Sequence, residues 1–222
     1  MSSDYRPHPR QNALKLCACS PSTIRVLEEP FRRAILRVLL ERTPVSTTEL
    51  SSLLTLALAS DISDGKSLSP DSVAIELHHT HLPKLVAAGL ITVDEDRGVL
   101  SLRTHPDVDG GPLTKQRLTA VGQAQWDVLA TIHTDSQRSE LLKRLDQSEG
   151  TETLSAVATA LAEANTPESV PACPDEIAIS LHHYHLPVLE EAGVVTYDAS
   201  AHEISYAGTE LFSLSELASA LR

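Results

Sequence analysis

Histidines are the residues of this 222-residue chain whose type and spacing most invite chemistry. They form two clusters with identical spacing: His78, His79 and His81, and then His182, His183 and His185. Histidines three positions apart share a helix face, so each cluster could chelate a metal ion. No carboxylate or cysteine stands at ligand spacing beside them, and they fall on an apolar helical stripe. We therefore interpret both clusters as structural, with no metal or cofactor; metal binding and pH sensing are the alternatives.

The rest of the sequence holds no pattern typical of an enzyme. It has no nucleophile–base pair and no glycine-rich phosphate loop. Three cysteines are too few for a disulfide framework. No apolar run approaches the length of a membrane-spanning helix, and the N-terminal apolar patch is too short for a signal peptide. We predict a cytoplasmic protein that is not an enzyme and does not contact membranes.

An internal repeat organises the chain and contains both histidine clusters. Residues 74–102 align with residues 178–206 at a constant offset of 104, and fourteen of the twenty-nine positions are identical. The predicted domains are 23–104 and 135–208, joined by a linker and connecting helix over 105–134. Residues 1–22 are predicted to form a loose tail, and 209–222 an amphipathic helix.

Each copy is predicted to contain three helices followed by a β-hairpin. In the first copy, Pro30 begins a helix that ends near Arg42, Ser46 caps a second helix to about Ala59, and the third covers 72–88. Two short apolar strands, 90–93 and 99–102, follow. The second copy repeats the plan with helices near 135–147, 152–164 and 175–192 and a hairpin over 194–206. Pro83 and Pro187 predict a kink inside each third helix.

The junction between third helix and hairpin resembles that of winged-helix regulators. Residues 81–91 read HLPKLVAAGLI, and the longer string LHHxHLPxLxxAG, followed by Tyr197 and Asp198, resembles a haloarchaeal winged helix-turn-helix family of unknown function. The resemblance implies two tandem winged-helix domains, thus a mainly α fold with small β-hairpins (α+β). It also implies that the third helix and the hairpin, or wing, are the elements that meet DNA.

The outer faces of the two third helices differ in chemistry. The first presents Ser72, Glu76, Thr80 and Lys84, whereas the second presents Glu176, Ser180, Tyr184 and Val188. Base-edge readout prefers basic or amide side chains, so the first copy is the better candidate. The candidate DNA contacts are Ser72, Thr80 and Lys84 of the third helix, Arg97 and Arg103 of the wing and its exit, and Arg32, Arg33 and Arg37 of the first helix. For these last three, a solvated face paired with Glu28, Glu29 and Glu41 is the alternative.

Charge separates the copies further. The net charge is −12, and residues 105–222 alone carry eighteen acidic and six basic side chains. A phosphate backbone is repelled by such a surface in ordinary salt. The excess of acid, with thirteen arginines and five lysines, favours a halophilic origin in a salt-rich cytoplasm.

These observations predict a DNA-binding transcriptional regulator. The first copy contacts double-stranded DNA, and the acidic second copy serves dimerisation or binds a protein partner. A homodimer would form through an expected helix over 113–132 or through 209–221. The alternative is a protein-interaction scaffold that uses winged-helix folds without binding DNA.

Overall fold

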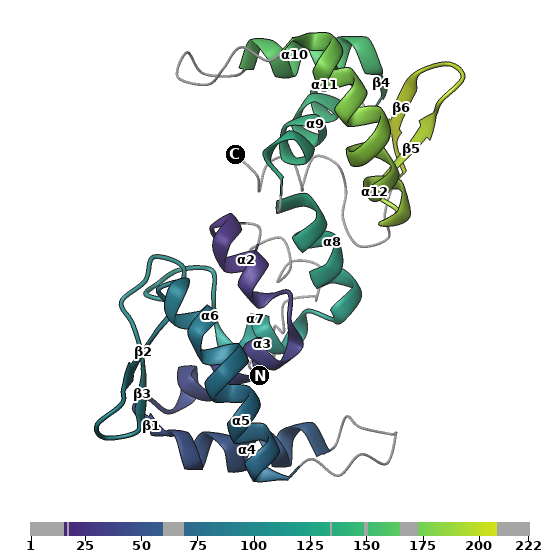
Figure 1. The fold of residues 1–222 in the computed structure, drawn as a ribbon. Helices are drawn as coiled ribbons and strands as arrows, with labels where there is room; N and C mark the ends of the chain where they lie inside the picture. Colours follow the sequence, from purple (N-terminus) through teal and green to yellow (C-terminus); the bar gives the residue numbers. More distant parts are fainter. Residues whose placement is uncertain are drawn as a thin grey trace, which may run out of the picture. The chain divides into compact units, whose positions relative to one another are not determined.

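The computed structural model describes residues 16, 18–59, 69–133, 135–148, 151–164 and 173–207 (Figure 1). The chain divides into two compact units, one formed by Cys19–Val121 and the other by Met1–Ala18 together with Gly122–Arg222. Each unit contains helices and one small three-stranded antiparallel sheet. The predicted α+β class, with two tandem domains, is confirmed.

The first unit follows the predicted order of elements with two additions. Its elements are α2 (Pro21–Leu27), α3 (Pro30–Glu41), β1 (Val45–Ser46), α4 (Thr47–Ala59), α5 (Pro70–Glu76), η1 (Leu77–His81), α6 (Leu82–Ala87), β2 (Ile91–Asp94), β3 (Val99–Leu102) and α7 (Lys115–Ala120). The additions are α2 and β1, since a two-residue strand has no measurable period. The Ser46 hydroxyl accepts from the N–H of Glu49, as its capping position predicts.

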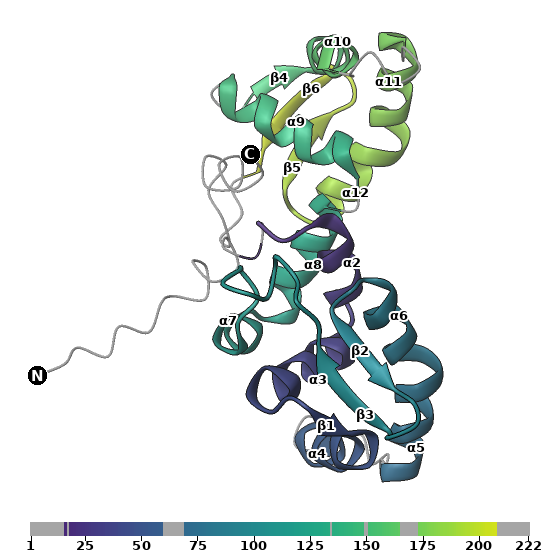
Figure 2. The ribbon, with the colours of Figure 1, turned by 90° about the vertical axis from the view of Figure 1, so that its left-hand side faces the viewer.

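The second unit repeats this order. Its elements are α8 (Gln123–His133), α9 (Ser136–Gln147), β4 (Thr151–Thr153), α10 (Leu154–Ala164), α11 (Pro174–Ser180), η2 (Leu181–His185), α12 (Leu186–Glu191), β5 (Val195–Asp198) and β6 (Glu203–Tyr206). Both sheets place the last strand in the centre, in the orders β1-β3-β2 and β4-β6-β5. In each unit the hairpin lies beside the last part of the third helix (Figures 1 and 2).

The core of each copy is aliphatic, as the scarcity of aromatic residues predicts. Leu77 and Leu85 of the first third helix and Leu181 and Leu189 of the second are inaccessible to solvent. The central strands contribute Leu100 and Ile204. Burial of such side chains is worth about 2 kcal/mol each, which makes these faces the main source of stability.

The segments outside the copies differ from their predictions. The expected single helix over 113–132 is two helices, because Val121 is extended and the N–H of Gly122 is capped by the Gln125 side chain. The expected linker is packed: the buried Asp107 carboxylate accepts from Ser20 N–H and from the Thr23 hydroxyl, at the start of α2. α2 itself begins inside the expected tail, where Leu16 and Cys19 are buried. The helix expected over 209–222 lies outside the described residues.

Candidate nucleic-acid interface and the histidine clusters

The third helix of each copy contains a π-helical segment in its middle. Ser69 caps α5 by accepting from the Ser72 N–H, and the helix then widens over η1, where the Leu82 N–H bonds the Leu77 carbonyl five residues back. Pro83 explains the widening: it has no N–H, and in a regular α-helix its ring would clash with the carbonyl of His79. η2 before Pro187 has the same geometry. The structure therefore shows a π segment where the sequence predicts a simple kink.

The π segment changes which histidines are buried. Among the six histidines of the two clusters, His81 and His185 are buried, His78, His79 and His183 are exposed, and His182 is half-buried. The expectation that all six lie on the apolar stripe was therefore wrong. It assumed an unbroken period of 3.6, and one extra residue in the turn rotates its neighbours toward solvent.

His81 and His185 each lie against the first helix of their copy. The His81 ring stacks on Phe31 of α3, with centroids 4.3 Å apart, and burial together with the nearby Arg32 lowers its pKa. The Arg138 Nε lies 3.4 Å from Nδ1 of His185, and burial lowers the pKa of this imidazole as well. Both rings are thus held neutral against the first helix of their copy.

The two arginines at the start of α3 are not surface residues. Arg32 and Arg33 are buried. The Arg32 Nε donates to the Val26 carbonyl, and the Arg33 Nη1 donates to the carbonyls of Leu27 and Glu28, each at 2.6 Å. Their guanidinium groups therefore satisfy the C-terminal end of α2, a site that favours cations. This corrects both expectations for them, a DNA contact and a solvated face.

The other predicted contacts of the first copy lie on its surface. Ser72, Thr80 and Lys84 are all exposed on the third helix, and Arg103 is exposed after β3. Arg37 is half-buried on α3. The Arg97 side chain is 82 % exposed in the turn between β2 and β3, but its Nε lies 3.8 Å from a carboxylate oxygen of Asp94. Glu95 and Asp96 share this turn, so the wing tip is acidic overall.

The second copy presents a different surface. Ile179, Tyr184 and Val188 of its third helix are 60 %, 70 % and 36 % exposed. Glu176 is exposed and Ser180 is half-buried, and no described residue of α11, η2 or α12 is lysine or arginine. This face is therefore apolar and acidic, without a cationic side chain from these three elements.

A hydrogen-bonded chain of three side chains distinguishes the second copy further. The Tyr197 hydroxyl lies 2.7 Å from Nδ1 of His182 and 3.1 Å from Nδ1 of His202. The first copy has Val93 and Gly98 at the positions of Tyr197 and His202. The sequence analysis did not predict these hydrogen bonds. The available signal was the histidine that stands in the second copy where the aligned first copy has Gly98. These hydrogen bonds tie the third helix to the wing.

The described residues show neither a metal cluster nor a membrane span. Within them, no three or more histidine, cysteine, aspartate or glutamate side chains gather in a way that would hold a metal ion. Among the same residues, no helix combines the length and the apolar character needed to cross a bilayer.

Comparison with known families places the chain in one of them. The model of a family described as a domain of unknown function, DUF7344, matches residues 24–101 and again residues 131–205. Together these segments cover more than half of the chain, so the chain belongs to this family and carries its domain twice. No curated protein and no solved structure matches the chain.

Proposed function

We propose that each copy is a winged helix-turn-helix domain and that the chain is a DNA-binding transcriptional regulator whose first copy contacts double-stranded DNA. The order helix, strand, helix, helix, strand, strand, with the last strand central in the sheet, supports the winged-helix reading. In that plan α5, η1 and α6 enter the major groove, and the β2–β3 hairpin is the wing.

The exposure of Ser72, Thr80 and Lys84 along one helix carries the proposal. Two hydroxyls and an ammonium group can bond base edges and phosphates, and Lys84 pairs with no carboxylate in the part of the chain that the structure describes. Arg97 and Arg103 add phosphate contacts from the wing. Arg97 contributes less than its position suggests, because Asp94 competes for its charge.

The experiment is fluorescence anisotropy of the full chain on a labelled duplex from the region upstream of its own gene, across a salt series. We expect saturable binding that Lys84→Glu weakens at least about tenfold and Arg97→Glu weakens less. The salt slope counts the phosphates contacted. Absence of binding at every salt concentration at which the chain is folded would refute the proposal.

Protein contact through the second copy is a second candidate function, favoured by the exposed Ile179, Tyr184 and Val188. Asp175, Glu176, Glu190 and Glu191 are exposed on the same helices, so the partner surface would be apolar with a basic rim. A photo-crosslinking amino acid at position 184 is expected to capture one discrete protein with such a surface in cells. The same amino acid at position 80, its counterpart in the first copy, is the control; equal capture at both positions would contradict the assignment.

We further propose that the chain works in the salt-rich cytoplasm of a haloarchaeon. A net charge of −12 and thirteen arginines against five lysines support this origin. Screening relieves the repulsion among the carboxylates, so the midpoint of thermal unfolding is expected to rise with KCl concentration. A midpoint that falls with added KCl would contradict it.

A further inference from the structure

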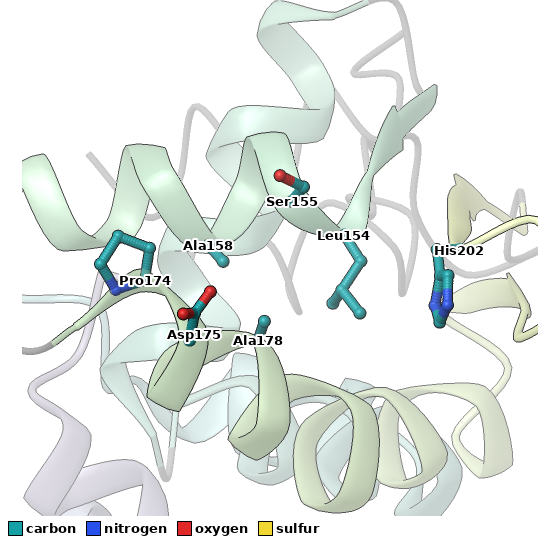
Figure 3. A pocket seen from close by; sticks show the side chains of 7 residues that line it. All are labelled: Leu154, Ser155, Ala158, Pro174, Asp175, Ala178 and His202. Carbon is teal, nitrogen blue, oxygen red and sulfur yellow. The ribbon is translucent and has the colours of Figure 1, made fainter.

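A pocket in the second copy lies between α10 and α11 and reaches the turn between β5 and β6 (Figure 3). Leu154 and Ala158 of α10 and Ala178 of α11 form its apolar lining, with their side chains directed into the space between the helices. The Asp175 carboxylate lies toward one end, and the His202 imidazole stands at the other. None of these residues belongs to the candidate DNA interface.

The first copy shows what is particular to this pocket. Two equivalent backbone hydrogen bonds show which residues of the two copies correspond. In the first copy the Thr47 N–H donates to the Gly98 carbonyl at 3.0 Å, and in the second the Leu154 N–H donates to the His202 carbonyl at 2.8 Å. Leu154 therefore stands where the first copy has Thr47, and Ala158 stands where it has Ser51. The second copy has thus exchanged two hydroxyls for apolar surface.

The carboxylate of this site has a counterpart in the first copy, whereas the imidazole has none. Asp175 follows the first proline of α11 just as Asp71 follows that of α5. At the other end, His202 replaces Gly98. The second copy therefore keeps an acidic group at one end and gains a polar ring at the other.

Two features of His202 set it apart from Gly98 of the first copy: its backbone conformation for a non-glycine residue and its contact with Tyr197. Its φ of 53° is left-handed, a region that Gly98 enters without strain at 61° in the first copy. Most non-glycine residues are disfavoured in this region, although histidine is among those that enter it more often. The Tyr197 hydroxyl fixes the ring by its contact with Nδ1, and the same hydroxyl contacts His182 in η2.

We propose that this pocket binds a small molecule with an apolar body and one ammonium group. The body packs on Leu154, Ala158 and Ala178, the ammonium group pairs with Asp175, and His202 closes the far end. Tyr197 transmits occupancy from His202 to His182, and so to the third helix of the same copy. The site is independent of DNA binding and adds a ligand-sensing role to the second copy.

The test uses benzylamine as the probe, added to the isotope-labelled full chain and followed by NMR. We expect saturable amide shifts confined to the start of α10, α11 and the β5–β6 turn. Benzyl alcohol, which has the same shape without charge, should bind about tenfold more weakly, and benzoate should not bind. Shifts that are absent, or that spread over the acidic surface without saturation, would overturn the proposal.

Matched variants locate the site. Asp175→Asn should weaken the binding of benzylamine about tenfold. Asp71→Asn, the same change in the first copy, should leave this affinity unchanged. His202→Gly copies the first copy and suits the left-handed backbone, so the chain should stay folded while binding weakens. Equal affinity in Asp175→Asn and the parent chain would overturn the site.

Tyr197→Phe tests the transmission. It removes the hydroxyl that links the two imidazoles, so benzylamine should still bind while the His182 ring resonances no longer respond to it. An unchanged response of His182 in this variant would overturn the link through Tyr197.

Discussion

Arg33 donates from one nitrogen to the carbonyls of Leu27 and Glu28, so its charge is committed to the end of α2. Bonds from a charged donor to backbone carbonyls are worth about 1.5–3 kcal/mol when they are buried. We expect Arg33→Ala to lower the free energy of unfolding by about 2 kcal/mol while leaving DNA affinity unchanged. Urea unfolding and anisotropy measure the two effects.

Arg37→Ala is the control, because Arg37 is half-buried and lies one turn later on the same helix. It should lower the free energy of unfolding by less than about 0.5 kcal/mol. A loss of DNA affinity in folded Arg33→Ala would restore this residue to the interface.

His133 gives stability a pH dependence of known sign. Burial lowers the pKa of this imidazole from 6.5 to about 4, so the folded chain holds it neutral. Below pH 6.5 this imidazole becomes protonated in the unfolded chain but stays neutral in the folded chain, so the stability of the fold decreases as the pH falls. Between pH 7 and pH 5 we expect His133 to lower the free energy of unfolding by about 2 kcal/mol. His133→Leu should remove this part of the pH dependence of stability measured by urea unfolding. The exposed His78→Leu is the control; an unaltered slope in His133→Leu would contradict the assignment.

Single residues mark where sequence reasoning stops. The exposure of Ser72, Thr80 and Lys84 follows from helical spacing and agrees with the structure. The burial of Arg32 and Arg33 could not be predicted, because their acceptors belong to α2, a seven-residue helix that the periodicity does not reveal. The contact of Tyr197 with His182 requires the hairpin to lie against the third helix, and this tertiary packing does not follow from the local sequence.

Among the elements, the segment expected to be a linker shows the largest difference from the sequence. A Cβ on Gly111 would lie 2.1 Å from the Pro106 carbonyl oxygen, whereas a Cβ on Gly110 would meet open space at a φ of 73°. We expect Gly111→Ala to destabilise the chain by at least about 3 kcal/mol, since backbone must move. Gly110→Ala should cost only about 1 kcal/mol from its left-handed backbone. Thermal unfolding compares the two. Equal, small effects would mean that residues 105–112 are a linker after all.

The long elements of both copies follow from the sequence, whereas the interruptions within them do not. Capping at Ser46, proline at the first helical turn and glycine at Gly89 place the helix ends within about two residues, which is the usual uncertainty of such ends. The π segments escape prediction because proline in a helix is compatible with a kink, a break or a widened turn. In the first copy the widened turn ends at His81, whose ring stacks on Phe31 of α3.

At the scale of the whole molecule, the chain is two compact units with the same plan and different surfaces. Leu85 and Leu189 are equivalent and fully buried, one in each unit. Leu85→Ala and Leu189→Ala should each lower the free energy of unfolding by about 2–5 kcal/mol. Each should speed up amide hydrogen exchange mainly within its own unit. Loss of protection in both units from either substitution would show that they unfold as one.

We propose that the two copies have divided their roles, the first binding DNA and the second not. Lys84 and Val188 occupy the same position of the repeat, and both are exposed. The most direct test is therefore anisotropy of Lys84→Glu beside Val188→Glu on the upstream duplex at one salt concentration. We expect Lys84→Glu to weaken DNA binding at least about tenfold and Val188→Glu to leave the affinity within about twofold of that of the parent chain. Equal losses in the two variants, or a loss confined to Val188→Glu, would contradict it.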